Sequence, residues 1–409
     1  MHGCMKGRAG TSRRLYRRAE KIFPGGVNSP VRYYAPYPLY MSGGTGSSIR
    51  DADGRVYTDY LLAYGPLILG HSHPRVVRAV SRVMEEGIMF GAPAAGEVEL
   101  GEIISGSCRS VEQLRLVPSG SEATMHALRL AMLHTGRRKI LKLRGGYHGT
   151  NSLALDPAAA REVEFNSVAQ AERELKKGEY AAFILEPAMG NCGLVLPEDG
   201  YLQAVRDATE KSGTVMIADE VITGFRTGFG AYSEAMGVMP DLLTFGKIVG
   251  GGLPLAAFGG RRDMMKHVRP AGSFQQAGTY AAHPVSVAAG LETLRILSSS
   301  DYTRLEECSR IAALELAKTG LTVNSSTGML SIFFTGDPVR NGGSAMAVGG
   351  EPFFRLFKAM LEEGIYLPPS QQELIFISFA HRKADVRRHF RTMAEAAASM
   401  AGRGRGLKV

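Results

Sequence analysis

With 409 residues, the chain is long enough to bury more than one hydrophobic core, so two domains are expected. Its net charge of +9 does not indicate a nucleic-acid partner, because much of the excess lies in residues 13–18 and 403–408 and no DNA- or RNA-binding motif accompanies it. No apolar run approaches the roughly 18 residues that cross a membrane. We therefore expect a small-molecule substrate, with neither nucleic acid nor membrane as a partner.

The cysteines indicate the cellular compartment. Cys4, Cys108, Cys192 and Cys308 show no C-x-x-C spacing, which argues against a zinc site and against a disulfide framework. The first twenty residues also lack the hydrophobic core of a secretory signal. A reducing, cytoplasmic environment is the expectation.

The N-terminal part is expected to form a helix, a loop and a hairpin. Residues 11–22 have the spacing of a short helix, and the prolines and glycines of residues 23–32 favour a rigid extended loop. Arg32 ends this loop, either as a surface arginine or as a fork for a carboxylate. Strand-like runs between residues 40 and 60 flank an Asp-Gly turn at residues 51–55.

The next stretch contains two histidines that could suggest a metal site. His71 and His73 have no third ligand nearby, so structural or capping roles are expected and no metal is predicted. Residues 76–86 show the periodicity of an amphipathic helix, with Val76, Val80, Val83 and Met84 on one face.

From about residue 95 the pattern alternates between helix and strand, which predicts a mostly parallel α/β sheet. A strand at residues 114–117 runs into the turn PSGSEAT at 118–124, and a helix is expected from residue 124 to about 133. A strand, a Ser/Gly turn and a helix together can bind phosphate through free N–H groups. The same Ser-Gly-Ser sequence is also an ordinary helix cap.

Chemically useful residues follow four predicted strands. Tyr147 follows the strand at 139–143, Glu186 and then Asn191 follow 181–185, Asp219 follows 214–218, and Lys247 follows 242–245. The carboxyl ends of parallel strands form the ligand crevice, and one crossover separates Asp219 from Lys247, so both should open on the same edge. The alternatives are helix capping by Asp219 and Glu220, and a solvated loop lysine before the glycines at 250–252.

Beyond about residue 300 the composition changes to a smaller α+β domain, with a helix at 302–318, strands at 329–334 and 374–379, and a final helix ending near residue 400. We expect an N-terminal segment (1–50) packed with this small domain (299–409), and a large domain (51–298) between them in sequence.

One cofactor explains these residues jointly, pyridoxal 5'-phosphate (PLP). A lysine after a strand can form an imine, because burial depresses its pKa. An aspartate can hold the pyridine nitrogen protonated, the turn at Gly120 and Ser121 can bind the phosphate, and Tyr147 can cover the ring. Each residue alone is weak support, but their order along the chain is specific.

The motif DEVITGFR at 219–226, followed by Gly246-Lys247 and its glycines, resembles the class III, fold-type I PLP-dependent aminotransferases. Within them, the motifs at 23–32, 65–71, 276–279 and 369–373 are similar to the glutamate-1-semialdehyde 2,1-aminomutase family. The resemblance runs from about Leu15 to the last helix, and the first of these four motifs is the most specific.

The resemblance implies a role for each matching residue. Lys247 would be the Schiff-base and proton-shuttle lysine, and Asp219 the partner of the pyridine nitrogen. The remaining expected cofactor ligands are Gly120, Ser121, Glu122, Tyr147, Asn191, Val221 and Thr279, with Glu186 lining the site. Thr279 would reach across from the other subunit of a homodimer. Arg32 would receive the substrate carboxylate, with Ser29, Tyr64 and Glu373 beside it, and Glu373 could pair with Arg32 in the empty site.

The implied reaction moves an amino group within one molecule. Glutamate 1-semialdehyde would become 5-aminolevulinate, for tetrapyrrole synthesis, through a diamine that must stay bound. The enzyme would start with its cofactor as pyridoxamine 5'-phosphate (PMP), and Lys247 would carry protons between the cofactor and the substrate carbons.

Three features depart from the aminomutase pattern. The segment 150–167 is shorter than the glycine- and serine-rich lid that the family usually carries. Tyr64 stands in place of the usual Trp, and His283 and Leu374-Ile375 replace other expected residues. The main alternative is therefore a class III aminotransferase or racemase acting on another amino acid or β-amino acid with a 2-oxo acid acceptor. A non-catalytic homologue or RNA-binding protein is disfavoured by the intact Lys247, Asp219, Tyr147 and Thr279.

Overall fold

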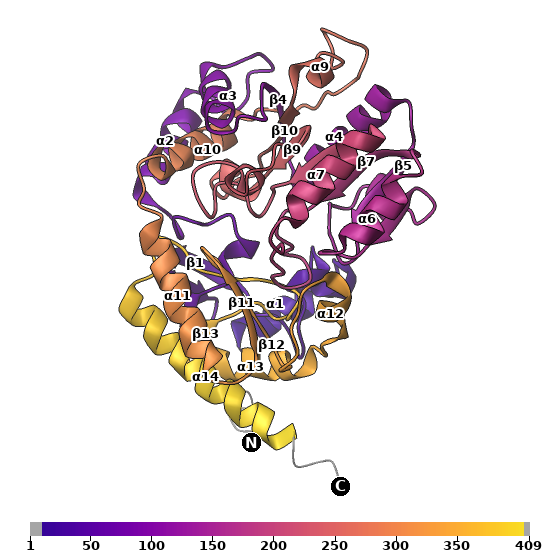
Figure 1. The fold of residues 1–409 in the computed structure, drawn as a ribbon. Coiled ribbons are helices and arrows are strands. Elements are labelled where there is room, and N and C mark those ends of the chain that lie inside the picture. The colour runs from indigo at the N-terminus through magenta and orange to yellow at the C-terminus, as the bar shows by residue number, and fades with distance from the viewer. Residues whose placement is uncertain (1–9, 405–409) are drawn as a thin grey trace.

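The computed structural model describes residues 10–404, so Cys4 and the basic residues after position 404 lie outside the described chain. A large α/β part occupies the upper half of Figure 1, and a smaller part built from both ends of the chain lies below it. No helix within residues 10–404 has the length and apolar character needed to cross a membrane.

A seven-stranded sheet forms the centre of the large part, in the order β4-β10-β9-β8-β7-β5-β6. Its strands are β4 (Gln113–Val117), β5 (Lys139–Leu143), β6 (Ala160–Val163), β7 (Tyr180–Leu185), β8 (Val215–Asp219), β9 (Leu242–Phe245) and β10 (Ala256–Gly260). The neighbouring pairs from β9 to β6 are parallel, whereas β10 runs antiparallel to both β4 and β9. The predicted mostly parallel α/β sheet is confirmed.

Helices cover both faces of this sheet. They are α2 (Pro74–Glu86), α3 (Ala95–Ser107), α4 (Gly120–Thr135), α5 (Ser152–Leu155), α6 (Val168–Leu175), α7 (Tyr201–Ser212), α8 (Tyr232–Ala235), α9 (Arg262–Met265) and α10 (Pro284–Leu297). Successive side chains of β8 point to opposite faces of the sheet, which shows which helices cover each face. Ile217 packs in the hydrophobic cluster beneath α4, whereas Met216 packs in the cluster that includes α6 and α7. Burial on both faces explains why β7 to β9 are continuous apolar runs.

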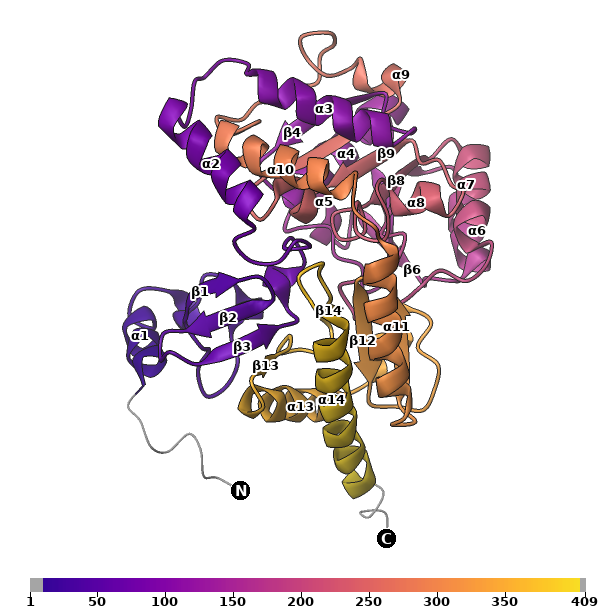
Figure 2. The ribbon, with the colours of Figure 1, turned by 90° about the vertical axis from the view of Figure 1, so that its left-hand side faces the viewer.

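The smaller part contains two further sheets (Figure 2). One has the order β1-β2-β3-β13 and the other β11-β12-β14. Their strands are β1 (Met41–Thr45), β2 (Ser48–Asp51), β3 (Val56–Asp59), β11 (Thr322–Ser326), β12 (Met329–Phe333), β13 (Ile365–Tyr366) and β14 (Ile375–Phe376). The helices are α1 (Thr11–Ala19), α11 (Thr303–Ala317), α12 (Gly342–Ala347), α13 (Glu351–Glu362) and α14 (Lys383–Gly404).

Because β3 pairs with β13, residues up to Asp59 share a sheet with the C-terminal part. The expected domain boundary between residues 50 and 51 therefore falls inside a sheet that continues further along the chain.

Several local predictions need correction. The first helix ends at Ala19 instead of residue 22, and the loop at 23–32 contains two short 3-10 turns, Pro24–Gly26 and Pro30–Arg32. Helix α4 begins at Gly120 instead of residue 124, because Ser119 caps it. The strand expected at 374–379 is only Ile375–Phe376.

Candidate active site

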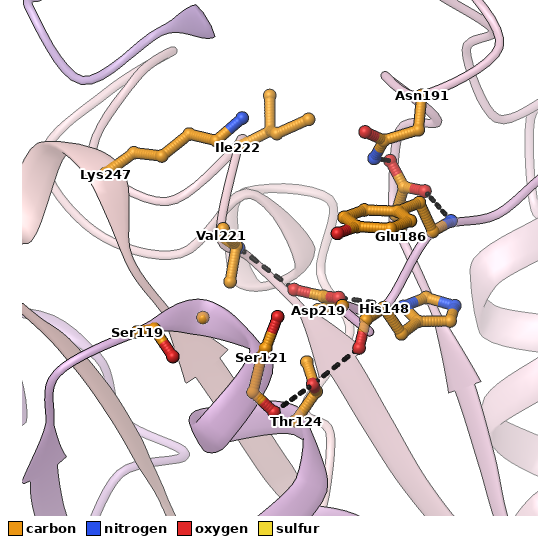
Figure 3. A pocket seen from close by; sticks show the side chains of 13 residues that line it. Ser119, Ser121, Thr124, His148, Glu186, Asn191, Asp219, Val221, Ile222 and Lys247 are labelled. Carbon is orange, nitrogen blue, oxygen red and sulfur yellow. Dashed lines mark hydrogen bonds and ion pairs between the residues drawn. The ribbon is translucent and has the colours of Figure 1, made fainter. Parts of the chain in front are cut away.

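The predicted residues at the strand ends meet in one pocket, drawn in Figure 3. The pocket lies at the carboxyl ends of the parallel strands, beside the first turn of α4. Its lining consists of Ser119, Gly120, Ser121, Thr124, Tyr147, His148, Gly149, Glu186, Asn191, Asp219, Val221, Ile222 and Lys247. Among the described residues, no group of three or more His, Cys, Asp or Glu side chains could hold a metal ion.

Asp219 ends β8, and every oxygen of its carboxylate is held. Oδ2 lies 2.7 Å from His148 Nδ1. Oδ1 accepts hydrogen bonds from Thr244 Oγ1 at 2.9 Å and from the Val221 N–H at 3.2 Å. Asp219 and His148 are both buried, so the acid is fixed in orientation without a ligand. Its neighbour Glu220 instead accepts from the first N–H groups of α8, so helix capping describes Glu220 and not Asp219.

Lys247 begins a short 3-10 turn, Lys247–Gly250, directly after β9. Its backbone has a φ of +48°, which is uncommon for a non-glycine residue and recurs at functional sites. The side chain extends toward Ile222 in Figure 3. Burial, reinforced by the charge of Arg226, lowers the pKa of the Lys247 amine to about 8. A sizeable neutral fraction is therefore present near neutral pH, as nucleophilic attack requires.

The first turn of α4 provides an anion site. Ser119 Oγ accepts from the Glu122 N–H, while no acceptor within the described chain takes the N–H of Gly120 or Ser121. These two donors at the positive end of a 16-residue helix suit a phosphate. Glu122 is absent from the pocket lining, and its N–H donates to Ser119 Oγ.

The glycines at the pocket permit close packing around Val221. A methyl group added at Gly120 or at Gly246 would lie 3.1 Å from Val221 Cγ1. At Gly149, where φ is +83°, the same addition would lie 2.3 Å from Ser121 Oγ. A side chain at any of the three positions would enter the space that Val221 and Ser121 occupy.

Glu186 organises the wall opposite Lys247. It is buried, and one of its oxygens accepts from the Tyr147 N–H at 3.0 Å while the other accepts from Asn191 Nδ2 at 2.9 Å and the Gly190 N–H at 2.8 Å. Burial raises the pKa of Glu186. Tyr147 remains 49% exposed, so its ring is open to a ligand.

The predicted substrate residues lie outside this pocket. Arg32 and Tyr64 line a second cavity between the N-terminal loop and the first small sheet, together with Asp59 and Tyr366. Ser29 is part-buried at the start of the turn that contains Arg32.

Glu373 lines neither cavity, but it interacts electrostatically with one residue of each, Lys247 and Tyr64. Burial raises its pKa against the charge of Lys247, and the charge of Glu373 in turn contributes to the raised pKa of Tyr64. No ion pair between Glu373 and Arg32 is present among the described residues, and Arg32 is exposed on its loop. Thr279 is likewise exposed and outside the pocket of its own chain.

Sequence reasoning missed His148, Thr124 and Arg226. His148 stands in the motif that singled out Tyr147, but its contact with Asp219 bridges 71 positions. Thr124 donates to the His148 carbonyl at 2.6 Å, and Arg226 ends the motif at 219–226 as a fully buried residue. Only the motifs themselves could have pointed to these three.

The sequence matches the model of the Aminotransferase class-III family over residues 31–167 and 157–378. The chain belongs to this family. Eight relatives at 41–44% identity are named glutamate-1-semialdehyde 2,1-aminomutase. One, from Thermoplasma volcanium, is 41% identical over 419 residues, covering 95% of this chain and all of the relative. The predicted resemblance is confirmed.

Solved structures agree on the fold. An omega-transaminase from Sphaerobacter thermophilus superposes with a TM-score of 0.89 at 28% identity, covering 95% of this chain and 98% of the other. A glutamate-1-semialdehyde aminomutase from Pseudomonas aeruginosa, crystallised with PMP, gives a TM-score of 0.87 at 23% identity, covering 95% and 94%. The second likeness bears on the fold alone.

The class III pocket residues fit the PLP or PMP predicted from the sequence. Gly120 and Ser121 present unused N–H donors for a phosphate, Asp219 presents a buried carboxylate for a ring nitrogen, and Lys247 presents an amine with a lowered pKa. Tyr147 and Val221 lie between these ends and would hold the faces of the ring. When bound, the cofactor supplies an electron-accepting ring and an exchangeable amino group.

Proposed function

We propose that this class III enzyme converts glutamate 1-semialdehyde into 5-aminolevulinate by intramolecular amino transfer, as its relatives' name describes. The observation that carries the proposal is the pairing of two sites: a pocket holding Asp219 and Lys247, and a neighbouring cavity holding Arg32. The 41–44% identity of eight aminomutases over nearly the whole chain supports the same substrate. Tetrapyrrole synthesis is the pathway that this product serves.

The pocket residues would have different roles in the reaction. Asp219, oriented by His148 and Thr244, would keep a ring nitrogen protonated. Lys247 Nζ would take a proton from one substrate carbon and return it to another, which its lowered pKa permits near neutral pH. Glu186 fixes Asn191 and the backbone of Tyr147, so the wall beside the reacting carbons stays in place.

Arg32 would bind the substrate's carboxylate. Its guanidinium is exposed and, among the described residues, has no carboxylate partner, so it is available as a bidentate donor. Glu373, a buried acid near Lys247, would stand beside the bound substrate and make a second carboxylate there unfavourable, because two close acids cannot both ionise without a large cost. This arrangement selects a ligand with a single carboxylate at the end nearest Arg32.

A homodimer would complete the site. Large apolar side chains on α2, α3 and the segment between them are more than half exposed, namely Met84, Ile88, Phe90 and Val98, and Tyr280 is 60% exposed next to Thr279. Exposed apolar groups concentrated on neighbouring elements are typical of an interface. In the proposed dimer a second copy covers this surface and brings its Thr279 to the phosphate end of the pocket.

The proposed reaction also requires that the diamine stay bound. Residues 150–167 form only α5, β6 and their turns, so the partner subunit and the Arg32 loop would have to keep the intermediate in place.

We propose the cytoplasm as the compartment, which the three free buried cysteines within the described chain support.

The test uses protein loaded with PMP. It receives glutamate 1-semialdehyde without another amino acceptor or donor, and 5-aminolevulinate is followed over many turnovers. Sustained product is expected. A single burst that leaves the cofactor as PLP would instead identify a transaminase that releases the diamine and needs an external donor.

The alternative is a class III aminotransferase acting on another amino acid or β-amino acid. The likeness to the omega-transaminase, at a TM-score of 0.89 and 28% identity, favours it. Half-reactions of the PLP form with β-amino acids would distinguish it, because the alternative predicts rapid conversion to PMP with such donors and none with 5-aminolevulinate.

A further inference from the structure

Arg226 is a fully buried cation without a carboxylate partner among the described residues. Its Nε donates to the Ile222 carbonyl at 2.8 Å, one terminal nitrogen donates to the Gly65 carbonyl, and the other has no hydrogen-bond partner. The guanidinium carbon lies 4.5 Å from the ring centroid of Phe376 in β14. Removing a charge from water costs free energy, so we expect the buried guanidinium to have a structural or functional role.

Its contacts join three segments: one lines the cofactor pocket, one lines the second cavity, and one carries Glu373. Ile222 lines the cofactor pocket, and Phe376 follows Glu373 by three residues. Gly65 ends a turn in which Leu62, Ala63 and Tyr64 have φ values of +47°, +55° and +67°. Three successive non-glycine residues in the left-handed region are strained. Such a turn persists only where its surroundings hold it.

Both ends of this turn are held. Asp59 Oδ1 accepts from the N–H groups of Leu61 and Leu62 at 2.8 and 3.0 Å. Arg226 holds the other end through the Gly65 carbonyl. The conformation fixes the direction of Tyr64.

Tyr64 uses its hydroxyl to hold the N-terminal loop. The hydroxyl donates to the Val31 carbonyl at 2.6 Å, and the next residue is Arg32. The charges of Arg32 and Glu373 both act on Tyr64, so the tyrosine is near enough to interact with both groups expected to meet the substrate.

We propose that Arg226 and Tyr64 are positioning residues that fix the loop at 29–32 and thereby set the affinity for the substrate carboxylate. The chain of contacts runs from Arg226 to Gly65, through the strained turn to Tyr64, and on to Val31 and Arg32. Neither residue is catalytic. The role in substrate affinity rests on the proposed function, whereas the role in holding the loop does not.

The first test measures the kinetics of Tyr64→Phe with the PMP-loaded enzyme. Its KM for glutamate 1-semialdehyde is expected to rise about tenfold, the value of one lost hydrogen bond to a positioned group, with kcat within about twofold. The spectrum of the bound cofactor should not change. In an Arg32→Ala background the Tyr64→Phe substitution should have no further effect, because it acts through Arg32.

The matched control is Tyr302→Phe. Tyr302 also donates its hydroxyl to a carbonyl, that of Phe225 at 2.9 Å, beside Arg226 but away from the Arg32 loop. An equal rise in KM for Tyr302→Phe would mean general loosening and would overturn the proposal. Additive effects of Tyr64→Phe and Arg32→Ala would overturn it as well.

The second test needs no substrate. Trypsin cleavage after Arg32 in the native protein is measured by mass spectrometry. The cleavage rate should be several-fold higher in Tyr64→Phe and in Arg226→Met than in the wild type. In Arg226→Lys the rate should fall part of the way back to the wild-type value. Tyr302→Phe should match the wild type. Unchanged cleavage in Tyr64→Phe would overturn the role in holding the loop. A wild-type enzyme that makes no 5-aminolevulinate would refute the proposed function, while the cleavage rates would still decide whether Tyr64 holds the loop.

Discussion

His148 Nδ1 lies 2.7 Å from Asp219 Oδ2, and both side chains are buried at the bottom of the pocket. Because Thr244 and the Val221 N–H hold the other oxygen, the carboxylate is oriented before any ligand arrives. Such preorganisation strengthens a charged contact, since no reorganisation is needed on binding.

We therefore expect His148→Leu to weaken cofactor binding by about 10- to 100-fold, the effect of leaving a buried carboxylate oxygen without its donor. Equilibrium titration of the cofactor-free protein with PLP measures this affinity. His148→Asn is the matched variant, because its amide can donate near the position of Nδ1, and it should recover most of the loss. Equal affinities for the two variants would show that the donor does not matter.

Lys247 should determine the pH dependence of covalent attachment. With a pKa of about 8, its amine is protonated below that pH and neutral above it, so the rate of PLP attachment should rise with pH and reach half its maximum near pH 8. Stopped-flow absorbance of the cofactor-free protein gives this profile. Lys247→Ala should lose the visible absorbance of the linkage. Its far-UV circular dichroism, which reports the fold, should stay unchanged. A visible spectrum identical to the wild type would contradict this role.

Gly149→Ala should damage both stability and cofactor binding. The new methyl group would meet Ser121 Oγ at 2.3 Å and its Cα at 2.6 Å, at a φ of +83°. Gly178→Ala is the control, since Gly178 has a φ of +67° with nothing within 4 Å. The control should lose about 1 kcal/mol of unfolding free energy from backbone strain alone. Gly149→Ala should lose more, and its PLP affinity should fall at least tenfold; equal urea midpoints and affinities would refute the clash.

His381 should make the fold sensitive to acid. Burial lowers the pKa of this ring to about 4 from an ordinary 6.5. Above pH 6.5 neither state binds the proton, and between 6.5 and 4 only the unfolded chain does, so stability falls as pH decreases through this window. The total loss is on the order of 3 kcal/mol.

Urea unfolding at a series of pH values tests this effect. His381→Asn keeps an acceptor for the Ser378 N–H but does not titrate, so it should flatten the slope between pH 6.5 and 4. The exposed His134, changed to Asn, is the control and should leave the slope as it is. An unchanged slope in His381→Asn would contradict the prediction.

The sequence allowed prediction of the residues that end buried strands, but not of contacts across them. Asp219 and Lys247 were placed on one edge because apolar runs and glycines mark strand ends locally. The partnership of His148 with Asp219 depends on how β5 and β8 flank β7, which no local pattern encodes. The strand at residues 160–163 could not be predicted for another reason. It is a short edge strand with two exposed residues, so it has neither the length nor the alternation of apolar and polar residues that marks a strand.

Val221 packs closely against two backbones, that of Gly120 and that of Gly246. The harm done by a substitution at either glycine should therefore depend on whether Val221 has been changed first. A methyl group at either glycine is expected to be harmful beside valine and tolerable after Val221→Ala has made room. A laboratory evolution experiment that varies the glycines first would find almost no survivors, whereas one that begins at Val221 would open a path to a wider pocket.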